Sequence, residues 1–298
     1  MNQDEPSAVE CRLIDARFQL LEKVWGDVPK LYNHAVLAQV GLPYRDQKEA
    51  RFFQRVSGGV ALQMEAGALP TVSGEFELVG LPYGPRARIL LLHLCSAAVL
   101  NQSPIVEVDD SFTAFAKTLG LAHNGRNIKT LRDQVRRMSV VQLRLAKSYG
   151  DFVDVFQGPI FSKLRAMFPA DASQQALWPS YVEFSADFYN SLRINAVPLR
   201  KEAISALKHS SRALDIYSWL AHRLYRVKRP TKIRWTTLRV QFGRRSQDMG
   251  GFKRAFKTAL KQVLMVYPDA QVFRVDGGLR IENSRPPVPF KKRSVLEG

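Results

Sequence analysis

Residues 81–138 read LPYGPRARILLLHLCSAAVLNQSPIVEVDDSFTAFAKTLGLAHNGRNIKTLRDQVRRM, and this stretch predicts helix, strand, helix, turn and helix in that order. Its apolar run, residues 89–100, is well short of the roughly 20 residues that a membrane span needs, so it predicts a buried core helix. A second helix, residues 111–119, ends at Gly120. A third helix follows over 125–138, where apolar residues recur at helical spacing. The order is that of a helix-turn-helix preceded by a helix and a strand.

The segments on either side extend this plan and then repeat it. After the third helix, VVQLRLA and DFVDVFQ alternate around the turn KSYGD, which predicts a β-hairpin wing. The second half has a long helix at 200–227, the strand-like IRW, the short helix TLRVQFG and the helix FKRAFKTALKQVL. A hairpin of VFRV and LRIE across two glycines closes it. We therefore predict an α+β fold with two tandem winged-helix domains, each a helix-turn-helix plus a β-hairpin wing, and an N-terminal mixed extension.

The domain boundaries follow from turn-rich and charge-poor intervals. In the first 80 residues the pattern predicts an amphipathic helix at 8–25, helical character at 34–40 and a hairpin that joins 60–66 to 76–81. The interval 168–199 contains several prolines and is slightly acidic, which is typical of a linker. The predicted domains are an N-terminal extension and candidate dimerisation element at 1–80, winged-helix domain 1 at 81–167, the linker at 168–199, winged-helix domain 2 at 200–285 and a basic C-terminal tail at 286–298.

The charge of the chain indicates a polyanionic partner. The 298 residues carry 44 Lys and Arg against 27 Asp and Glu, a net charge of +17. By segment the net charge is −3 for 1–80, +6 for 81–167, −2 for 168–199 and +16 for 200–298. The positive charge therefore falls on the two predicted domains, as expected of two modules that bind nucleic acid.

The predicted third helix of domain 1 separates core from charge. A projection at about 100° per residue sets its apolar side chains on one side and its basic ones on the other. Its arginines suit bidentate contacts with guanine. Asp133 can accept from a cytosine amino group or hold a neighbouring arginine. In domain 2, Arg254, Lys257 and Lys261 form an outward stripe without an acid, which favours phosphate contacts.

These faces and the two predicted wings supply the candidate DNA contacts. Substitution of Arg132 or Arg136 by Ala is expected to relax sequence preference, whereas substitution of Lys257 or Lys261 is expected to weaken binding to every duplex. The residues expected to bind DNA are Arg126, Asn127, Lys129, Thr130, Arg132, Asp133, Arg136, Arg137, Arg144, Lys147, Lys232, Arg234, Arg244, Arg245, Lys253, Arg254, Lys257, Lys261, Arg274 and Arg280.

Each of these features also has a simpler interpretation. One charged stripe on a helix is usually just its solvated face, and only the repetition of the stripe in a repeated plan favours DNA binding. His123, before the third helix, is a candidate phosphate contact or a surface residue. The KKR at 291–293 adds nonspecific charge or belongs to an unstructured terminus.

Catalytic, metal-binding and secretory signals are missing from the sequence. The five histidines and two cysteines show no metal-ligand spacing, and no phosphate-binding GxxxxGK[ST] loop or GxSxG motif occurs. We therefore expect no enzyme activity, no metal and no cofactor. The first ten residues, MNQDEPSAVE, carry no secretory signal, so we expect a cytoplasmic protein without a membrane partner.

The run LPYGPRARILLLHLCSAAV, with the following helices, the upstream LPYRD and the basic second half, resembles the plasmid-encoded RepA replication initiators. The resemblance covers roughly residues 40–285, and LPYG with its helix is its most specific part. It implies a protein without catalysis that binds repeated sites at a plasmid origin, helps to open AT-rich duplex and recruits host replication proteins. It also implies a homodimer in some members, and DNA contacts on residues 126–137 and 254–261.

Three hypotheses remain open from the sequence. The first is an origin-binding initiator, and the second is a winged-helix transcriptional regulator, such as an autorepressor. The third is an enzyme such as a relaxase or integrase, for which Tyr149 or Tyr267 is poor support because no catalytic constellation surrounds either. Initiator and regulator both predict tight, salt-dependent DNA complexes, so DNA binding does not separate them.

Overall fold

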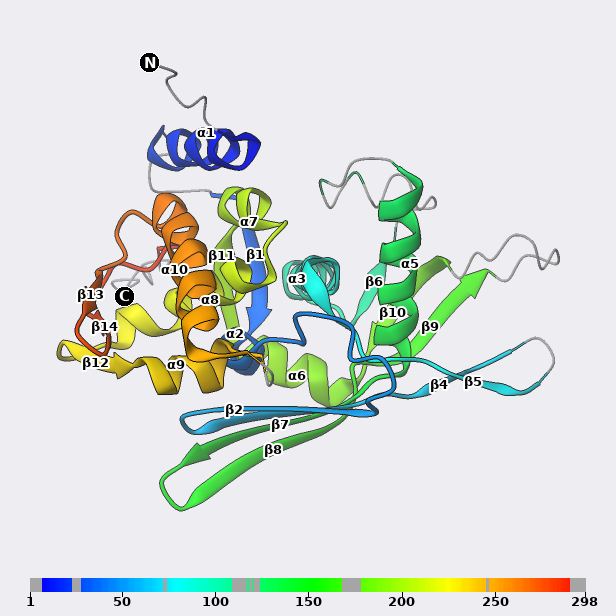
Figure 1. Cartoon of the computed structure of the whole chain (residues 1–298). Helices are drawn as coiled ribbons and strands as arrows, with labels where there is room; N and C mark the ends of the chain where they lie inside the picture. Colours follow the sequence, from blue (N-terminus) through cyan, green and yellow to red (C-terminus); the bar gives the residue numbers. More distant parts are fainter. Residues whose placement is uncertain are drawn as a thin grey trace, which may run out of the picture.

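A computed structural model describes residues 7–22, 28–71, 74–108, 117, 120, 124–167, 178–244 and 247–289 of the chain. Figure 1 shows the order of the elements. The first half contains α1 (Ala8–Glu22), β1 (Lys30–His34), α2 (Ala35–Val40), β2 (Phe52–Ser57), β3 (Val60–Glu65), β4 (Ala68–Pro70), β5 (Phe76–Leu78), α3 (Gly84–Leu100), β6 (Ile105–Glu107), α5 (Gly125–Val140), β7 (Gln142–Tyr149) and β8 (Phe152–Pro159). The second half contains β9 (Phe161–Met167), β10 (Trp178–Phe184), α6 (Ala186–Ile194), β11 (Ala196–Arg200), α7 (Lys201–Leu207), α8 (Ser211–Arg223), the 3-10 turn η1 (Leu224–Arg226), β12 (Thr231–Arg234), α9 (Trp235–Phe242), α10 (Met249–Val266), β13 (Val272–Val275) and β14 (Gly278–Ile281).

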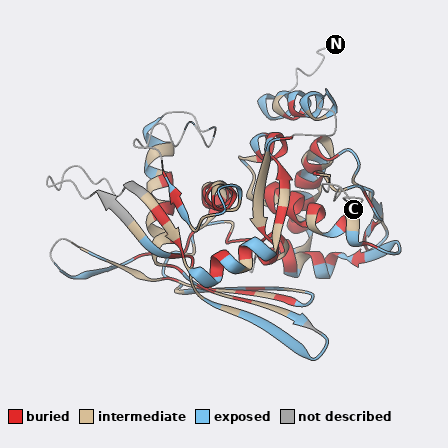
Figure 2. Ribbon diagram, turned by 180° about the vertical axis from the view of Figure 1, so that it is seen from behind, coloured by how far each residue is buried: buried red, intermediate tan, exposed pale blue. Residues whose placement is uncertain are grey.

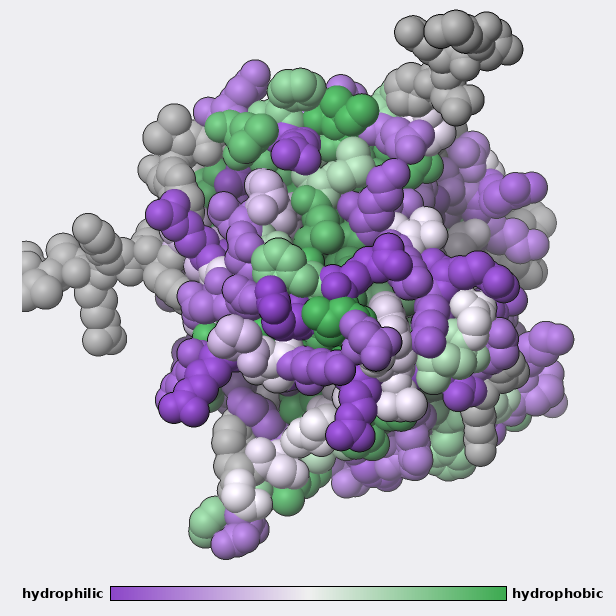
Figure 3. Space-filling view, turned by 60° about the vertical axis from the view of Figure 1, so that its left-hand side comes forward, coloured by the Kyte–Doolittle hydropathy of each residue, from purple (hydrophilic) through white to green (hydrophobic). Residues whose placement is uncertain are grey.

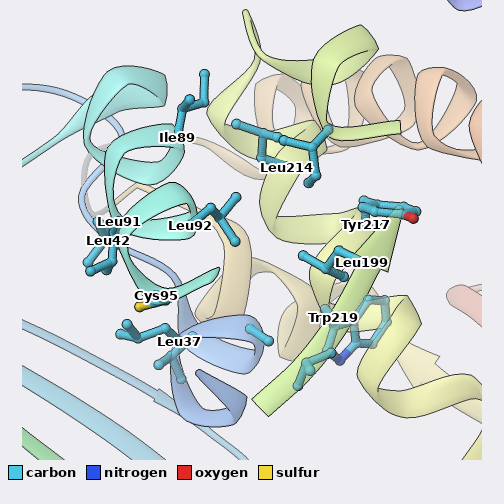
Figure 4. Packing of buried hydrophobic residues seen from close by; sticks show 14 of the residues in the cluster. Leu37, Leu42, Ile89, Leu91, Leu92, Cys95, Leu199, Leu214, Tyr217 and Trp219 are labelled. Atoms are coloured by element: carbon cyan, nitrogen blue, oxygen red, sulfur yellow. The ribbon is translucent and has the colours of Figure 1, made fainter. Parts of the chain in front are cut away.

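Helix α3 is the central helix of the fold, and its prediction as a buried helix is confirmed. A proline in its first turn suits the start of a helix, where the missing N–H would be unpaired in any case. Gly84 takes a positive φ of +75°, which a side chain would strain. Apolar residues surround the helix, and a helix that is apolar all round has to be enclosed by protein. Figure 4 shows Ile89, Leu92 and Cys95 of α3 on the side that packs toward Leu214 of α8 and Leu37 of α2.

The hairpin β7–β8 forms where it was predicted, but it does not pair with β6 as a wing of domain 1 would. It joins β2 and β3 in a four-stranded sheet of order β2-β3-β7-β8, which lies below the helices in Figure 1. Leu62 of β3 lies opposite Leu145 of β7, and Met64 opposite Leu143, with all four side chains buried. This apolar match between distant strands explains the pairing.

Strand β6 pairs instead with β10, in a three-stranded sheet of order β6-β10-β9. The hairpin β9–β10 therefore occupies the place that the sequence assigned to β7–β8. The predicted helix at 111–119 lies outside the described residues, apart from Lys117.

The first 80 residues and the interval 168–199 differ from the predicted extension and linker. Strand β1 pairs with β11 from Lys30↔Arg200 to His34↔Ala196, and β3 pairs with β7. The expected linker contains all of β10 and α6 and most of β11. The early residues are thus built into the main core, because their apolar strands find partners far along the chain. Dimerisation through them stays a prediction.

Smaller differences concern local elements. The predicted hairpin between 60–66 and 76–81 is replaced by two hairpins, β2–β3 and β4–β5. The long helix predicted at 200–227 is divided into α7 and α8, because Ser210 caps a new helix by accepting the N–H of Ala213 at 3.2 Å.

The elements predicted for domain 2 from residue 231 onward occur in the predicted order. Strand β12 is followed by α9, α10 and the hairpin β13–β14, and β14 pairs with both β12 and β13. Gly277, in the tight turn of the hairpin, has a φ of +72°. One continuous hydrophobic cluster joins both halves of the chain. Figure 2 shows buried residues concentrated in the central helices, with exposed residues on α1 and at the tip of β7–β8.

Candidate nucleic-acid interface

Helix α10 presents the cationic stripe that the sequence predicted. Asp248 caps its N-terminus by accepting the N–H of Gly251 at 3.1 Å. Phe252, Phe256 and Val263 are fully buried, and Phe256 packs against the ring of Phe242 with centroids 5.5 Å apart. These apolar anchors fix which side of the helix faces outward.

The outward side of α10 carries the cations. Arg254 and Lys261 are exposed, and Lys253 and Lys257 are half-buried. The predicted division of this helix into an apolar and a basic side is therefore confirmed. Figure 3 brings the side of the molecule with α10 and β12–β14 forward, where many hydrophilic residues lie among scattered apolar ones.

A surface hollow of about 500 Å³ lies between α10 and the turn of the β13–β14 hairpin. The Trp235 backbone N–H donates to the Gly277 carbonyl at 3.0 Å, which fastens the hairpin turn to the start of α9. Lys257 Nζ lies 5.9 Å from the centroid of the Trp235 ring, a cation–π contact that positions its charge. The residues that line the hollow are Trp235, Lys253, Lys257, Arg274, Val275, Asp276 and Gly277. Three cations against one acid give a hollow with the charge and size to accept an anion such as a phosphodiester group.

The other predicted cations of this half lie on the adjoining β12-β14-β13 sheet or after α9. Lys232, Arg234, Arg274 and Arg280 are exposed on the β12-β14-β13 sheet. Arg280 is compensated, because its Nε lies 2.9 Å from Glu282 and its guanidinium lies over the Phe273 ring at 5.0 Å. Arg244 is half-buried after α9, and Arg245 lies outside the described residues.

In the first half, the outward cations of α5 are concentrated at its N-terminal end. Asn124 caps the helix by accepting the N–H of Asn127 at 2.9 Å. Arg126 and Lys129 are exposed. Asn127 accepts from Arg86 at 2.8 Å, and the Thr130 hydroxyl donates to the Arg126 carbonyl at 2.8 Å, so both polar side chains have partners within the protein.

The C-terminal half of α5 is tied into the protein instead. The Arg137 guanidinium donates to Asp133 at 2.9 Å, to Asp46 at 3.2 Å and to the Leu81 carbonyl at 3.1 Å, and it lies 5.0 Å from the centre of the Tyr83 ring. These carboxylates raise the pKa of Arg137 against the effect of its burial. The sequence expected Arg137 to contact DNA, whereas the structure uses it to hold α5. Asp133 follows the second interpretation given above and holds an arginine.

Two further residues of α5 that were predicted to contact DNA, Arg132 and Arg136, are only partly exposed. Arg136 pairs with Glu77 of β5 at 2.5 Å, with both side chains partly exposed. Arg132 is half-buried. Because surface pairs of this kind contribute about 0–1 kcal/mol, Arg136 can exchange Glu77 for another anion at small cost.

Arg144 and Lys147 lie on β7, which pairs with β3 and β8 and not with β6. They are three residues apart, so they point to opposite faces of the sheet. Arg144 pairs with Glu65 at 3.3 Å. Burial is the main cause that lowers the pKa of His34 and of the half-buried His222, and the charge of Lys147 adds to it. Their predicted role as wing contacts was wrong in its structural premise, because β7–β8 pairs with β3 and not with β6.

Sequence reasoning missed Trp235 and a cluster around Tyr44, in which Arg55, Arg88 and Arg212 meet one ring. The LPYRD and LPYG motifs had been singled out, but no role was derived for them. A usable signal was present. Arg88 directly precedes the apolar run 89–92 of a helix that was predicted to be buried, and a buried charge requires a partner elsewhere.

Titratable groups in the interior have structural roles. Burial lowers the pKa of His34 to about 4 and that of His222 to about 3, and it raises the pKa of the Cys95 thiol. The Tyr267 hydroxyl is engaged with the Arg285 carbonyl at 2.7 Å. Within the described parts of the chain, no group of three or more His, Cys, Asp or Glu residues is placed to hold a metal ion. In the same residues, no helix combines the length and apolar character needed to cross a membrane. His123 and the KKR at 291–293 lie outside the described residues.

Comparison with models of known protein families shows which family the chain belongs to. The family model described as "Plasmid encoded RepA protein" matches residues 81–237, which is more than half of the chain. The chain belongs to this family. The resemblance inferred from LPYG and the helices after it is therefore confirmed. The matched region runs from the start of α3 to the first turn of α9 and includes α5 and the joint between the two halves.

Solved structures share the fold at low sequence identity. A crystal structure of domains 2 and 3 of RctB aligns with a TM-score of 0.52 and 10% identity, and the alignment covers 84% of this chain and 98% of that one. A second structure of RctB domains 2-3 aligns with a TM-score of 0.48 and 10% identity, over 83% of this chain and 94% of that one. No curated protein sequence matches the chain. The first alignment supports a mixed α+β architecture that spans both halves.

Proposed function

We propose that this member of the RepA family is a sequence-specific double-stranded DNA-binding initiator of plasmid replication. It binds one duplex through two winged-helix units and has no catalytic activity or cofactor of its own. The single observation that carries this proposal is the cationic side of α10 beside the hollow at the β13–β14 turn. In a helix-turn-helix protein the second helix enters the major groove, and the wing reaches the backbone beside it.

The second unit consists of α8, β12, α9, α10 and the β13–β14 wing. Lys253, Lys257 and Arg274 converge on the hollow and suit the phosphate backbone. Lysines act as flexible point charges and carry little base specificity. This unit therefore supplies the salt-sensitive part of the affinity.

The first unit consists of α3, β6, α5 and a revised wing, β9–β10. Arg126 and Lys129 lie at the exposed N-terminal end of α5. The N-terminal residues of a recognition helix are those that reach base edges. We assign base reading to this end, where an arginine can make a bidentate contact with guanine.

Further properties come from the family resemblance. They are binding to repeated sites at a plasmid origin, opening of the adjacent AT-rich duplex, recruitment of host replication proteins, action in the cytoplasm and formation of a homodimer. The proposal places Arg126, Lys129, Arg254 and Lys261 on the DNA. Arg137, Arg144 and Lys147 are left in structural roles, because their contacts lie within the protein.

The direct test is footprinting of the full chain on the DNA that flanks its gene, followed by a salt titration on the protected site. We expect protection of repeated sites and a binding constant that falls steeply with salt. Each neutralised phosphate should add about 0.9 to the slope of log K against log salt. Binding that is independent of salt, or equal on all sequences, would contradict the proposal.

A transcriptional regulator of the same fold would use the same DNA face. Replication of a minimal origin plasmid in the presence of the protein separates the two functions. Replication that depends on the chain, and is lost when Lys257 is replaced by Ala, supports an initiator. Promoter repression without replication would support a regulator.

A further inference from the structure

The residues 42–46, LPYRD, connect the two candidate recognition helices, and neither charge nor helical periodicity signals this role. They lie between α2 and β2 and have no helix or strand of their own. One end of the segment contacts α5, and its middle contacts the elements that hold the α9–α10 turn. We call residues 42–46 the coupling segment.

At the α5 end, Asp46 meets Arg137. The two carboxylate oxygens of Asp46 accept from the two terminal nitrogens of Arg137 at 3.2 and 3.3 Å. Arg137 is held on its other side by Asp133, one helical turn earlier, at 2.9 Å. A two-point contact of this kind fixes direction as well as distance. The coupling segment therefore contacts the C-terminal half of α5 directly, through the side chain of Arg137.

At its middle, the ring of Tyr44 is contacted by three guanidinium groups. The Cζ atoms of Arg55, Arg88 and Arg212 lie 4.9, 5.0 and 5.2 Å from the ring centroid. The face of an aromatic ring attracts cations, and it does so more strongly where water is excluded. Tyr44 thus gathers arginines from β2, α3 and α8 at one point.

Two of these arginines also donate hydrogen bonds to the α9–α10 turn. Arg55 donates to the Gly243 carbonyl, which directly follows α9, at 3.3 Å. Arg212 donates to Gln247 Oε1, which precedes the α10 cap, at 3.1 Å. The Gln241 side chain adds a third contact by donating to the Gln39 carbonyl at 2.6 Å. Arg55 and Arg212, which both contact the Tyr44 ring, therefore hold the two sides of the α9–α10 turn.

The third arginine, Arg88, links α3 both to α8 and to the coupling segment. Arg88 of α3 forms a two-point ion pair with Asp215 of α8 at 2.7 and 2.8 Å, with both side chains buried. Arg88 also donates to the carbonyls of Leu42 and Pro43, at the start of the coupling segment. At Gly41 a Cβ atom would lie 2.3 Å from an Asp215 carboxylate oxygen, so only glycine allows this approach.

We propose that the coupling segment, through Asp46 and Tyr44, fixes the separation and relative orientation of α5 and α10, so that both helices enter one duplex only at one spacing of their subsites. Tyr44 is in this sense a positioning residue. The inference rests on the proposed DNA binding and deepens it. Rigid linkage of two binding modules raises affinity only when geometry permits both to engage at once.

The test compares DNA duplexes in which the two halves of the footprinted site are separated by 0, 2 or 5 added base pairs. The full chain is compared with Tyr44→Leu, which removes the aromatic face, and with Tyr44→Phe, which keeps the face and removes the hydroxyl. Two added base pairs rotate the second groove by about 70° relative to the first. For the unchanged chain and for Tyr44→Phe, we expect affinity to fall by about 100-fold on this duplex. For Tyr44→Leu we expect a fall of less than about 10-fold, since α5 and α10 can then change their relative orientation to match the rotated groove.

A second variant keeps the test decisive if Tyr44→Leu folds poorly. Asp46→Ala removes the α5 end of the coupling at a carboxylate that is 39% exposed, and it is expected to flatten the spacing profile in the same direction. Salt-dependent binding with equal affinity at all spacings by the unchanged chain would overturn the coupling but leave the proposed function standing. So would a Tyr44→Leu or Asp46→Ala profile identical to that of the unchanged chain. Failure of the unchanged chain to bind any duplex specifically would overturn both.

Discussion

At the scale of single residues, the molecule divides its cations into two kinds. Arg88 and Arg137 have their donors satisfied by carboxylates and carbonyls of the protein. Arg254 and Lys261 lie on an exposed helix face, and Lys257 lines the hollow beside it. Net charge alone does not distinguish the two kinds. Burial and partners do, and they decide which substitutions affect stability and which affect binding.

Replacement of Lys257 by Ala is expected to weaken binding to specific and random duplexes alike, by about tenfold, because one phosphate contact is lost from the hollow. The slope of log K against log salt should become shallower by about 0.9. Lys201→Ala, at an exposed position at the start of α7, serves as the control. Fluorescence anisotropy across a salt series measures both quantities. Equal losses in the two variants would remove the hollow from the DNA face.

His34 predicts a pH dependence of folding. Its Nδ1 accepts the N–H of Val36 at 3.2 Å, and its other nitrogen lies 2.9 Å from the Ser191 hydroxyl. Burial lowers its pKa to about 4 in the folded state, against about 6.5 when unfolded. Below pH 6.5 the unfolded chain binds a proton that the folded chain does not, so stability from this residue is lost as the pH falls from 6.5 to 4.

The measurement is the free energy of unfolding of the unchanged chain and of His34→Asn at pH 7 and pH 5. Asparagine keeps an acceptor for the cap of α2 but does not titrate. We expect the variant to lose less stability between the two pH values than the unchanged chain. The same difference in both proteins would mean that His34 titrates normally in the folded state.

At the scale of elements, α10 depends on its cap as well as on its aromatic core. Asp248→Ala removes the acceptor for the Gly251 N–H and should cost about 1 kcal/mol of stability. Asp248→Asn keeps an acceptor and should cost much less. Urea denaturation of both variants provides the comparison, and a cost as large for Asn as for Ala would contradict a capping role.

Helices were predictable from the sequence because their signals are local. The faces of α5 and α10 follow from apolar residues three and four apart, whereas their caps, Asn124 and Asp248, were found only in the structure. The partners of the strands were not predictable in the same way. β7 pairs with β3 about 80 residues earlier in the chain, and β1 pairs with β11 more than 160 residues later. A hairpin that alternates correctly predicts that two strands form but not the sheet they join, so β7–β8 was taken for a wing.

In the candidate site, too, the features on one helix were predictable, and the contacts between distant segments were not. The stripe of Arg254, Lys257 and Lys261 was visible in the sequence, because all three lie on one helix. Trp235 and Arg274 reach the hollow from two other elements, and only the folded chain brings them to Lys257. Arg137 was assigned to DNA because its position on the helical wheel cannot show that Asp46, from a distant segment, lies beside it.

At the scale of the whole molecule, the buried pair Arg88–Asp215 joins α3 of the first half to α8 of the second. Arg88→Met or Asp215→Ala should each lower the free energy of unfolding by about 3–5 kcal/mol, because each leaves an unpaired buried charge. The double variant should lose less than the sum of the two, which denaturation measures as a coupling energy. Glu183→Gln, in a partly exposed pair with Lys163, is the control and should cost less than about 1 kcal/mol. Additive losses for Arg88 and Asp215 would show that the two halves are not coupled through this pair.

The arrangement of both helices on one duplex is tested most directly by cleavage of DNA from reagents tethered to the protein. In a chain with Cys11 replaced by Ser, a single cysteine is placed at Lys129 on α5 or at Thr258 on α10 and carries an iron chelate that cuts nearby DNA. Buried Cys95 stays in place. We predict two sets of cuts on the same duplex, about one helical turn or 10 base pairs apart. Cuts from only one of the two positions, or overlapping cuts from both, would contradict binding by two helices in successive grooves.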